Sequence, residues 1–443
     1  MSRSTNRLVR YFSAIPGFER AVEWMKLTGI TGAAQFVVQG IGLLSGILVV
    51  RLLPTEEYAL YTLGNTMLGV MVVLADSGIS SGIMAQGGKV WKDKDKLGEV
   101  LVTGLDLRKK FAVGSLLIAA PILIYLLNYH GASWLMSGLI VLSLIPALVG
   151  SLSGAIFMVP LKLRQDIPPL QKNIIFESMG RLVLVLSLFL TPFTFIALLA
   201  SGIPRMVMNI RLKTLAKGYV NWAAQINLQI RKDILKIVKR LMPGAIYYCV
   251  SGQISIWLIS IFGSTTSVAQ IGALGRIAIA LTVISNLFGT LVYPRFARLS
   301  NRTGLLIKRF IQIIALLFLI CSLVVFFVWL FSDQILWILG DGYSNLNIEL
   351  VLSIIGSCLG LISGAVFKLT THRNWAVHPG LSIPVSILGI IAGAVIMDVS
   401  TLQGILLFNI FVVLVQFVLN TSYFAFEIIR QRKKELNLSP NKE

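Results

Sequence analysis

Residues 134–160 read WLMSGLIVLSLIPALVGSLSGAIFMVP and contain no charged side chain. A helix of about 20 predominantly apolar residues is long enough to cross the hydrocarbon core of a bilayer, and this stretch exceeds that length. Similar runs recur along the chain from Thr28 to Phe424. A segment inside a membrane must satisfy its own backbone hydrogen bonds, so these repeated runs predict an all-α polytopic membrane protein.

The composition of the 443-residue chain agrees with that class. Hydrophobic residues make up 56% of the sequence and charged residues only 13%, whereas about 25% of a soluble domain is charged. The mean hydropathy is +0.82. These values exclude a soluble domain as the main body of the protein.

We expect twelve transmembrane helices. Their ranges are 28–52, 57–84, 111–129, 134–160, 172–190, 192–212, 241–263, 266–294, 310–332, 346–368, 378–398 and 401–426.

The basic residues orient these helices. Of the 39 lysines and arginines, 35 lie in the N-terminal segment, the C-terminal tail and alternate connections between the expected spans. The positive-inside rule therefore places both termini and all the longer connections in the cytoplasm. The net charge of +20 follows from this topology and from attraction to anionic lipid headgroups, so it implies no nucleic-acid partner.

A basic connector over residues 217–240 divides the chain into two sets of six spans. Ile226, Ile230 and Ile234 recur in it at helical spacing among basic residues, which predicts an amphipathic helix at the membrane interface. A shift of 212 residues places Gly32-Ala33 on Gly244-Ala245, and both halves start on the same side. Parallel repeats of this kind usually enclose a central cavity. The expected units are a cytoplasmic segment (1–27), a six-helix bundle (28–216), the connector (217–240), a second six-helix bundle (241–426) and a cytoplasmic tail (427–443).

Four arginines are left after the basic residues of the termini and connections are counted, and two acids join them inside the expected spans. An uncompensated charge at the centre of a membrane helix costs about 2.5–3.5 kcal/mol on insertion scales. We therefore expect these residues to face the bundle interior or a watery cavity, except at a span end, where an arginine can extend to the interface. The residues are Arg51, which lies at such an end, Arg181, Arg205, Arg276, Asp76 and Glu177.

Arg181, Arg205 and Arg276 are the candidate substrate-binding residues, because arginine can hold phosphate in a bidentate manner. Arg205 and Arg276 have no acid within four residues on their own helix. Glu177 precedes Arg181 by four residues, and this spacing fits either an internal ion pair or a substrate or proton site.

Asp76 opens a run of small residues, which favours a role in helix packing or gating over direct contact with a substrate. Asp76 and Glu177 are the candidates for gating or ion coupling.

Signals for catalysis, cofactors or metals are weak. The three cysteines lie in apolar spans, and the histidines lack metal-ligand spacing. The string Asp93-Lys94-Asp95 belongs to a solvated charge run, and the sequence contains no phosphate-binding loop of the Walker type. We therefore expect a protein that is not an enzyme and holds no cofactor.

Short motifs carry a family resemblance. Residues 51–61 read RLLPTEEYALY and residues 76–79 read DSGI, with Ala59 at a position where glycine is usual. The strings GRI (275–277), PRF (294–296) and GDGY (340–343) follow later in the chain. Together with the plan of six spans plus six, they resemble the polysaccharide transporters, or O-antigen (Wzx-type) flippases, of the multidrug/oligosaccharidyl-lipid/polysaccharide flippase superfamily.

The resemblance implies a transporter of the bacterial inner membrane. It would move a polyprenyl-pyrophosphate-linked oligosaccharide from the cytoplasmic to the periplasmic leaflet by alternating access. Arg181, Arg205 and Arg276 would attract pyrophosphate or acidic sugars, while Asp76 and Glu177 would gate the cavity or couple it to an ion. The partners implied are the lipid-linked oligosaccharide, membrane lipids, a polysaccharide polymerase and a chain-length regulator. The alternatives are a cation-coupled exporter of the multidrug-extrusion type and a membrane enzyme of polysaccharide assembly.

Overall fold

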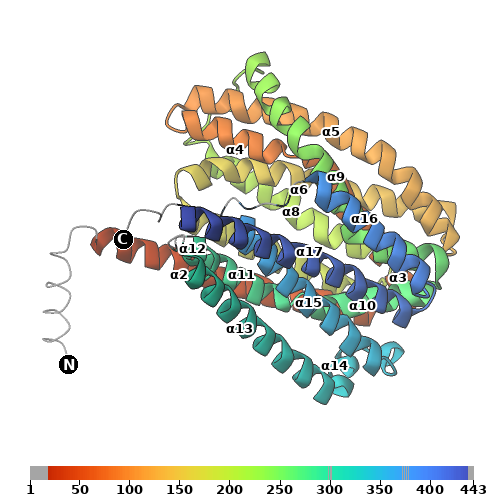
Figure 1. The fold of residues 1–443 in the computed structure, drawn as a ribbon. Helices are drawn as coiled ribbons and strands as arrows, with labels where there is room; N and C mark the ends of the chain where they lie inside the picture. The colour runs from red at the N-terminus through yellow and green to blue at the C-terminus, as the bar shows by residue number, and fades with distance from the viewer. Residues whose placement is uncertain are drawn as a thin grey trace, which may run out of the picture.

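The computed structural model describes residues 18–297, 299, 302–371, 373, 375, 377 and 379–437. Within these residues every regular element is a helix, which confirms the all-α prediction, and the long helices run roughly side by side (Figure 1). The elements are α2 (Phe18–Leu52), α3 (Thr55–Asp76), α4 (Ile79–Val90), α5 (Lys94–Tyr129), α6 (Trp134–Leu163), α7 (Ile167–Val185), η1 (Leu186–Phe189), α8 (Thr194–Ala216), α9 (Leu228–Phe262), α10 (Thr265–Ala278), α11 (Leu281–Leu291), α12 (Tyr293–Ala297), α13 (Thr303–Leu330), α14 (Ser332–Leu339), η2 (Asp341–Tyr343), α15 (Asn347–Thr371), α16 (Pro379–Ile396) and α17 (Leu402–Asn437).

Among the described residues, ten helices are long and apolar enough to cross a membrane, and the pair α10 and α11, bent by 44°, would make eleven. The remaining expected range, 172–190, coincides with α7 and η1. Helix α7 has 19 residues but includes Lys172, Glu177 and Arg181. Three charged residues therefore interrupt its apolar sequence, α7 is not among the ten helices, and the count of twelve stays a prediction.

Several helices extend beyond the expected spans. Helix α5 begins at Lys94, well before residue 111, and the Asp93 carboxylate accepts hydrogen bonds from the backbone N–H groups of Asp95 and Lys96. These bonds satisfy two of the donors that a helix start leaves free, so Asp93 is an N-cap. The extension is stabilised because its apolar residues, including Leu97 and Leu101, are fully buried.

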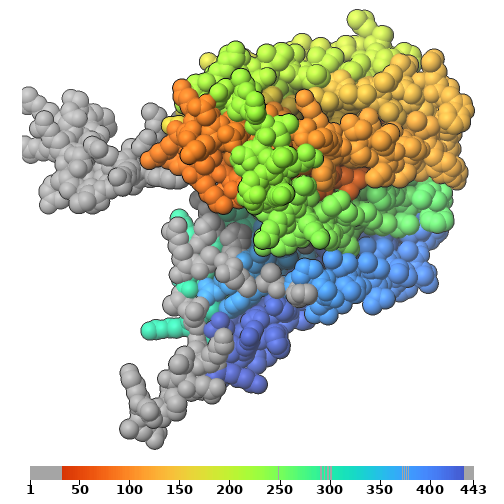
Figure 2. Space-filling view, turned by 90° about the horizontal axis from the view of Figure 1, so that it is seen from above, coloured from red at the N-terminus to blue at the C-terminus, as the bar shows by residue number. Residues whose placement is uncertain are grey.

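The connector forms part of α9, which continues without a break from Leu228 to Phe262. Ile234 and Val238 are 0% and 3% exposed, and they pack in one cluster with residues of α4 and α5. The Cβ position of Gly82 lies 3.0 Å from Cγ2 of Ile234. Ile234 and Val238 therefore face protein, whereas Ile226 at the start of the stripe is 45% exposed. Figure 2 shows the start of α9, in green, across the orange surface of α4 and α5.

In Figure 2 the orange segments of the first half of the chain lie on one side of the molecule and the blue segments of the second half on the other, with the light-green start of α9 across the orange side. Helices α3 and α10 join them, because a Cβ atom added at Gly272 would lie only 2.3 Å from Oγ1 of Thr62. The central cavity between the halves stays a prediction.

Further contacts join the halves at the predicted outer face. His130 Nε2 lies 2.9 Å from the carbonyl oxygen of Ser260, and Nδ1 lies 2.9 Å from Oγ1 of Thr265. Burial lowers the pKa of His130, so the ring is mainly neutral at pH 7. The Arg51 guanidinium carbon lies 5.2 Å from the centre of the Trp337 ring in α14. This face of the molecule is therefore closed by contacts between the halves.

Candidate functional site

Asp76 is paired inside the N-terminal half. It ends α3, just before Ser77 and Gly78, whose positive φ angles of 39° and 94° separate α3 from α4. Its carboxylate accepts hydrogen bonds from the Arg108 guanidinium and from the backbone and hydroxyl of Ser80. Arg108 is 3% exposed and also donates to the carbonyl oxygen of Leu152. The acid is thus held by a buried cation and by the start of α4.

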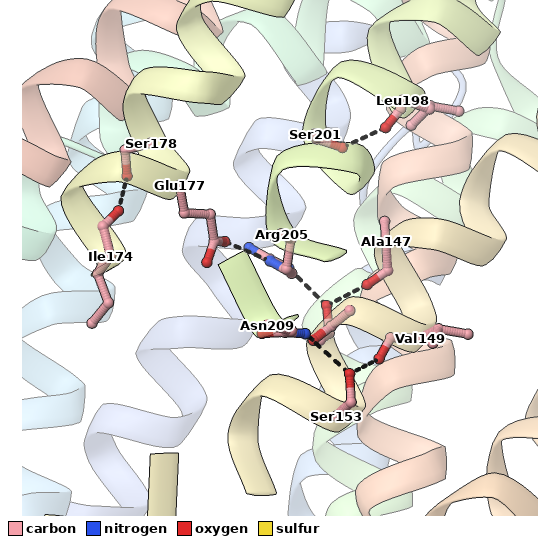
Figure 3. Close-up of polar contacts among 12 residues, drawn as sticks. Ala147, Val149, Ser153, Ile174, Glu177, Ser178, Leu198, Ser201, Arg205 and Asn209 are labelled. Atoms are coloured by element: carbon pink, nitrogen blue, oxygen red, sulfur yellow. Dashed lines mark hydrogen bonds and ion pairs between the residues drawn. The ribbon is translucent and has the colours of Figure 1, made fainter. Parts of the chain in front are cut away.

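Arg205 and Glu177 form a second ion pair, between α8 and α7 (Figure 3). Arg205 Nε donates to Glu177 Oε1 at 2.7 Å, and Nη1 donates to Ser151 Oγ at 2.7 Å. On the next turn of α8, Asn209 Nδ2 donates to the carbonyl oxygen of Gly150 at 2.6 Å. Glu177 therefore neutralises Arg205 across helices, instead of forming the pair with Arg181 that their spacing allowed.

Arg276 lies where the two halves meet. Its guanidinium carbon is 5.4 Å from the centre of the Tyr61 ring, and its Nε donates to the Tyr58 hydroxyl at 3.4 Å. The Cβ position of Gly46 on α2 lies 3.3 Å from Arg276 Cδ, so a glycine there leaves room for the side chain. Tyr58 and Tyr61 stack on each other with centroids 5.7 Å apart and are almost fully buried. Helices α2, α3 and α10 thus position one arginine between the halves.

Arg181 approaches the same place from α7. It interacts electrostatically with Tyr61, as Arg276 does. Its Nε is buried and has no hydrogen-bond partner within the described part of the chain. Among the described residues, no carboxylate lies within 4.0 Å of a guanidinium nitrogen of Arg181 or Arg276. Two arginines, one from each half, therefore converge on Tyr61 without an acid to neutralise them.

This pair of arginines has a clear chemical preference. Both arginines are half-buried, and a charge in such a place is costly without an opposite charge, so an anion is the ligand that would lower the cost for both side chains. Guanidinium groups bind phosphate oxygens through two parallel hydrogen bonds, and in a site with little water these charge-assisted bonds are strong. We define Arg181, Arg276, Tyr58 and Tyr61 as the arginine site.

The structure separates the five predicted site residues into three places. Asp76 is in the first ion pair, Glu177 and Arg205 form the second, and Arg181 and Arg276 share the arginine site.

The sequence analysis missed Arg108, Tyr58 and Tyr61 as site residues. Arg108 stood in a stretch counted as a connection, although Leu97, Leu101 and Gly104 give that stretch a helical apolar stripe. The two tyrosines lie within the motif at residues 51–61, but nothing in that string indicated an arginine partner.

Within the described residues, no group of three or more histidine, cysteine or acidic side chains is placed to hold a metal ion.

No protein-family model and no curated protein sequence matches the chain. Solved structures do match it. The lipid II flippase MurJ in an inward closed conformation aligns with a TM-score of 0.69 and 12% identity, over 90% of this chain and 88% of that one. An inward-facing multidrug resistance MATE transporter of the MOP superfamily aligns with a TM-score of 0.62 and 17% identity, over 89% and 95%.

A MOP-superfamily transporter from Pyrococcus furiosus, described as having a binding pocket of reverse polarity, aligns with a TM-score of 0.53 and 17% identity, over 92% and 95%. At these identities the likeness concerns the fold. This chain is therefore an all-α protein, built to span a membrane many times, with the fold of the MOP-superfamily transporters.

Proposed function

We propose that the protein is a flippase for a polyprenyl-pyrophosphate-linked oligosaccharide. The cargo would be a repeat unit of O-antigen, capsule or exopolysaccharide, moved from the cytoplasmic to the periplasmic leaflet of a bacterial inner membrane. The observation that carries this proposal is the convergence of Arg181 and Arg276 on Tyr61 without a carboxylate partner among the described residues.

The charge of the cargo fits this arrangement. A pyrophosphate linking a lipid to a sugar carries two negative charges, and the arginine site offers two positive ones. Each phosphate can accept a bidentate pair of hydrogen bonds from one guanidinium. Because Arg181 belongs to the N-terminal half and Arg276 to the C-terminal half, one bound pyrophosphate would contact both halves. Movement of the halves against each other would then change access to the cargo, as alternating access requires.

The fold gives this proposal independent support, since a lipid II flippase is among the matching structures. The motifs at residues 51–61 and 76–79 point to the polysaccharide branch of the superfamily. A polysaccharide polymerase and a chain-length regulator would be the partners that receive and extend the exported unit, and membrane lipids would surround the protein.

Removing either arginine tests the proposal. We expect Arg181→Ala and Arg276→Ala each to lower surface glycan about tenfold or more when the chain complements a strain that lacks its own flippase. A hydrogen bond to a charged group contributes about 1.5–3 kcal/mol, and 1.4 kcal/mol corresponds to a factor of ten. The matched control is Arg211→Ala, because Arg211 is exposed on α8, with its guanidinium carbon 5.0 Å from the centre of the Phe176 ring. Normal surface glycan in both site variants, at normal protein levels, would refute an anion site.

A cation-coupled exporter of small molecules is the second candidate, favoured by the likeness to MATE transporters. Such a protein would need a free acid for its cation, whereas Asp76 and Glu177 are each bound to an arginine. Cellular accumulation of ethidium distinguishes the candidates. We expect the same accumulation with and without the protein, and lower accumulation in cells expressing it would favour the exporter.

A further inference from the structure

The C-terminal half contains a cavity of different chemistry from the arginine site. It has a volume of about 430 Å³ and lies between α9, α15, α16 and α17, towards their predicted cytoplasmic ends. That volume is within the range of about 300–1,000 Å³ of small-ligand sites. We call it the inner cavity. Its polar lining includes Tyr247, Ser363, Ser382, Ser386, Gln416 and Asn420.

A second cavity continues this chemistry along the same helices. It measures about 310 Å³, lies between α9, α10, α15 and α17, and is lined by Ser255, Ser353 and Asn409 among others. Ser255 Oγ donates a hydrogen bond to Asn409 Oδ1 at 2.7 Å. Hydroxyl and amide groups therefore line two cavities between α9, α15 and α17, at different positions along these helices.

No charged side chain occurs among the residues that line either cavity. Hydroxyls donate and accept hydrogen bonds, and amides offer two donors and an acceptor. Such a lining suits a ligand that is itself neutral and rich in hydroxyl and amide groups, because burying those groups without hydrogen bonds costs several kcal/mol. Sugars and N-acetyl sugars have this chemistry, whereas an ion would find no opposite charge among these lining residues.

Glycines keep the inner cavity open. A Cβ atom added at Gly244, Gly360 or Gly364, which all line the cavity, would meet no heavy atom within 4 Å. A methyl group at any of these positions would therefore enter open volume without a clash. A substitution at one of these glycines would therefore reduce the open volume of the inner cavity.

The cavity lies within reach of the arginine site. Helix α9, which supplies Tyr247, contacts α3, where Cys249 Sγ lies 3.8 Å from the carbonyl oxygen of Val70. Val70 and Tyr61 belong to the same straight element, α3, and at 1.5 Å per residue they are about 13 Å apart along its axis. A pyrophosphate at Tyr61 and an oligosaccharide of several sugars attached to it would be long enough to cover this distance.

We infer that the inner cavity binds the neutral sugar portion of the cargo while Arg181 and Arg276 hold its pyrophosphate. This assignment rests on the proposed function. In it, the charged pyrophosphate is recognised where the two halves meet, and the neutral sugar is recognised by hydrogen bonds in the C-terminal half. The inner cavity would then determine which glycan is accepted.

Two lipid probes test the assignment on the purified full-length protein by native mass spectrometry. One is polyprenyl pyrophosphate, and the other is the same lipid carrying a neutral oligosaccharide of N-acetylhexosamines. We expect the wild type to bind the sugar-bearing lipid at least tenfold more tightly. Gly364→Val, which narrows the cavity, should remove this preference and leave the affinity for the sugar-free lipid unchanged.

Two variants serve as checks. Gln416→Leu should also lose the preference for the sugar, because it removes an amide from the lining without filling the volume. Gly114→Val is the matched control, since Gly114 is a half-buried helical glycine of α5 whose added Cβ would also meet nothing within 4 Å.

The outcomes separate the two proposals. Equal binding of both lipids to the wild type, or an undiminished preference in both Gly364→Val and Gln416→Leu, would overturn the sugar assignment alone. Failure of both lipids to bind the wild type, or binding of both that Arg276→Ala does not weaken, would overturn the proposed function as well.

Discussion

At the scale of single residues, Asp76 and Arg108 form an ion pair, and removing either side chain alone destabilises the protein. Removing one member of a buried ion pair leaves an uncompensated charge and costs about 3–5 kcal/mol, whereas replacing both with apolar residues is often close to neutral. Arg108 is the more deeply buried partner, at 3% exposure.

We therefore expect Asp76→Leu to lower the unfolding temperature of the purified protein strongly. The double variant Asp76→Leu/Arg108→Met should recover most of that loss and should export glycan. Thermal unfolding in detergent and the complementation assay measure the two quantities. A double variant that is as stable as the wild type but inactive would instead give Asp76 the gating or coupling role that the sequence suggested.

The partners of the membrane arginines show the limit of sequence reasoning at this scale. The absence of an acid near Arg205 on its own helix indicated correctly that any partner must come from elsewhere. Glu177 could not be chosen in advance, because its spacing fitted Arg181 equally well. The choice depends on packing, since the Cβ position of Gly180 lies 3.1 Å from Cβ of Pro204, and this close approach brings Arg205 beside Glu177.

At the scale of elements, the apolar segments could be read from the sequence, but the helix ends could not. The residues from Lys94 to Lys110 carry many charges. Their apolar stripe stabilises a helix only when α4, α6 and α9 bury it. The same holds for the first turns of α9, whose isoleucines would fit lipid or protein equally well. Amphipathic periodicity predicts a buried face, and only tertiary contacts decide what buries it.

Gly98 tests how the start of α5 is tied to the connector. A Cβ atom there would lie 2.2 Å from the backbone carbonyl oxygen of Asn221, so Gly98→Ala must displace the connector. We expect a destabilisation of about 1–3 kcal/mol, typical of overpacking, with faster proteolysis within residues 217–227. Gly88→Ala is the control, because its added Cβ meets nothing within 4 Å and alanine favours helix. Unchanged proteolysis in Gly98→Ala would show that this contact does not hold the connector.

At the scale of the whole molecule, the sequence predicted two parallel halves of six spans, and that plan stays a prediction. The contact between the halves was not predictable, since Thr62 and Gly272 are ordinary residues in apolar runs. A Cβ atom added at Gly272 would lie 3.1 Å from Cβ of Thr62, and this short distance follows from how α3 and α10 cross.

A reversible cross-link tests whether the halves must separate at this contact. A disulfide needs Cβ atoms about 3.5–4.5 Å apart, so a small shift of α10 would allow Thr62→Cys/Gly272→Cys to form one. We expect oxidation to stop glycan flipping in proteoliposomes and a reductant to restore it, while the single variant Thr62→Cys remains active under oxidant. Full activity in the cross-linked protein would mean that transport proceeds without opening here.

The two arginines of the arginine site also have an electrical consequence. If the proposed pyrophosphate leaves at the periplasmic face, the empty site retains two positive charges between the halves. A membrane potential that is negative inside favours a positive charge nearer the cytoplasm, by about 2.3 kcal/mol per elementary charge per 100 mV for a full crossing of the field. The voltage would therefore return the empty transporter to its cytoplasm-facing state, while the loaded site, being neutral, would move with little resistance from the field.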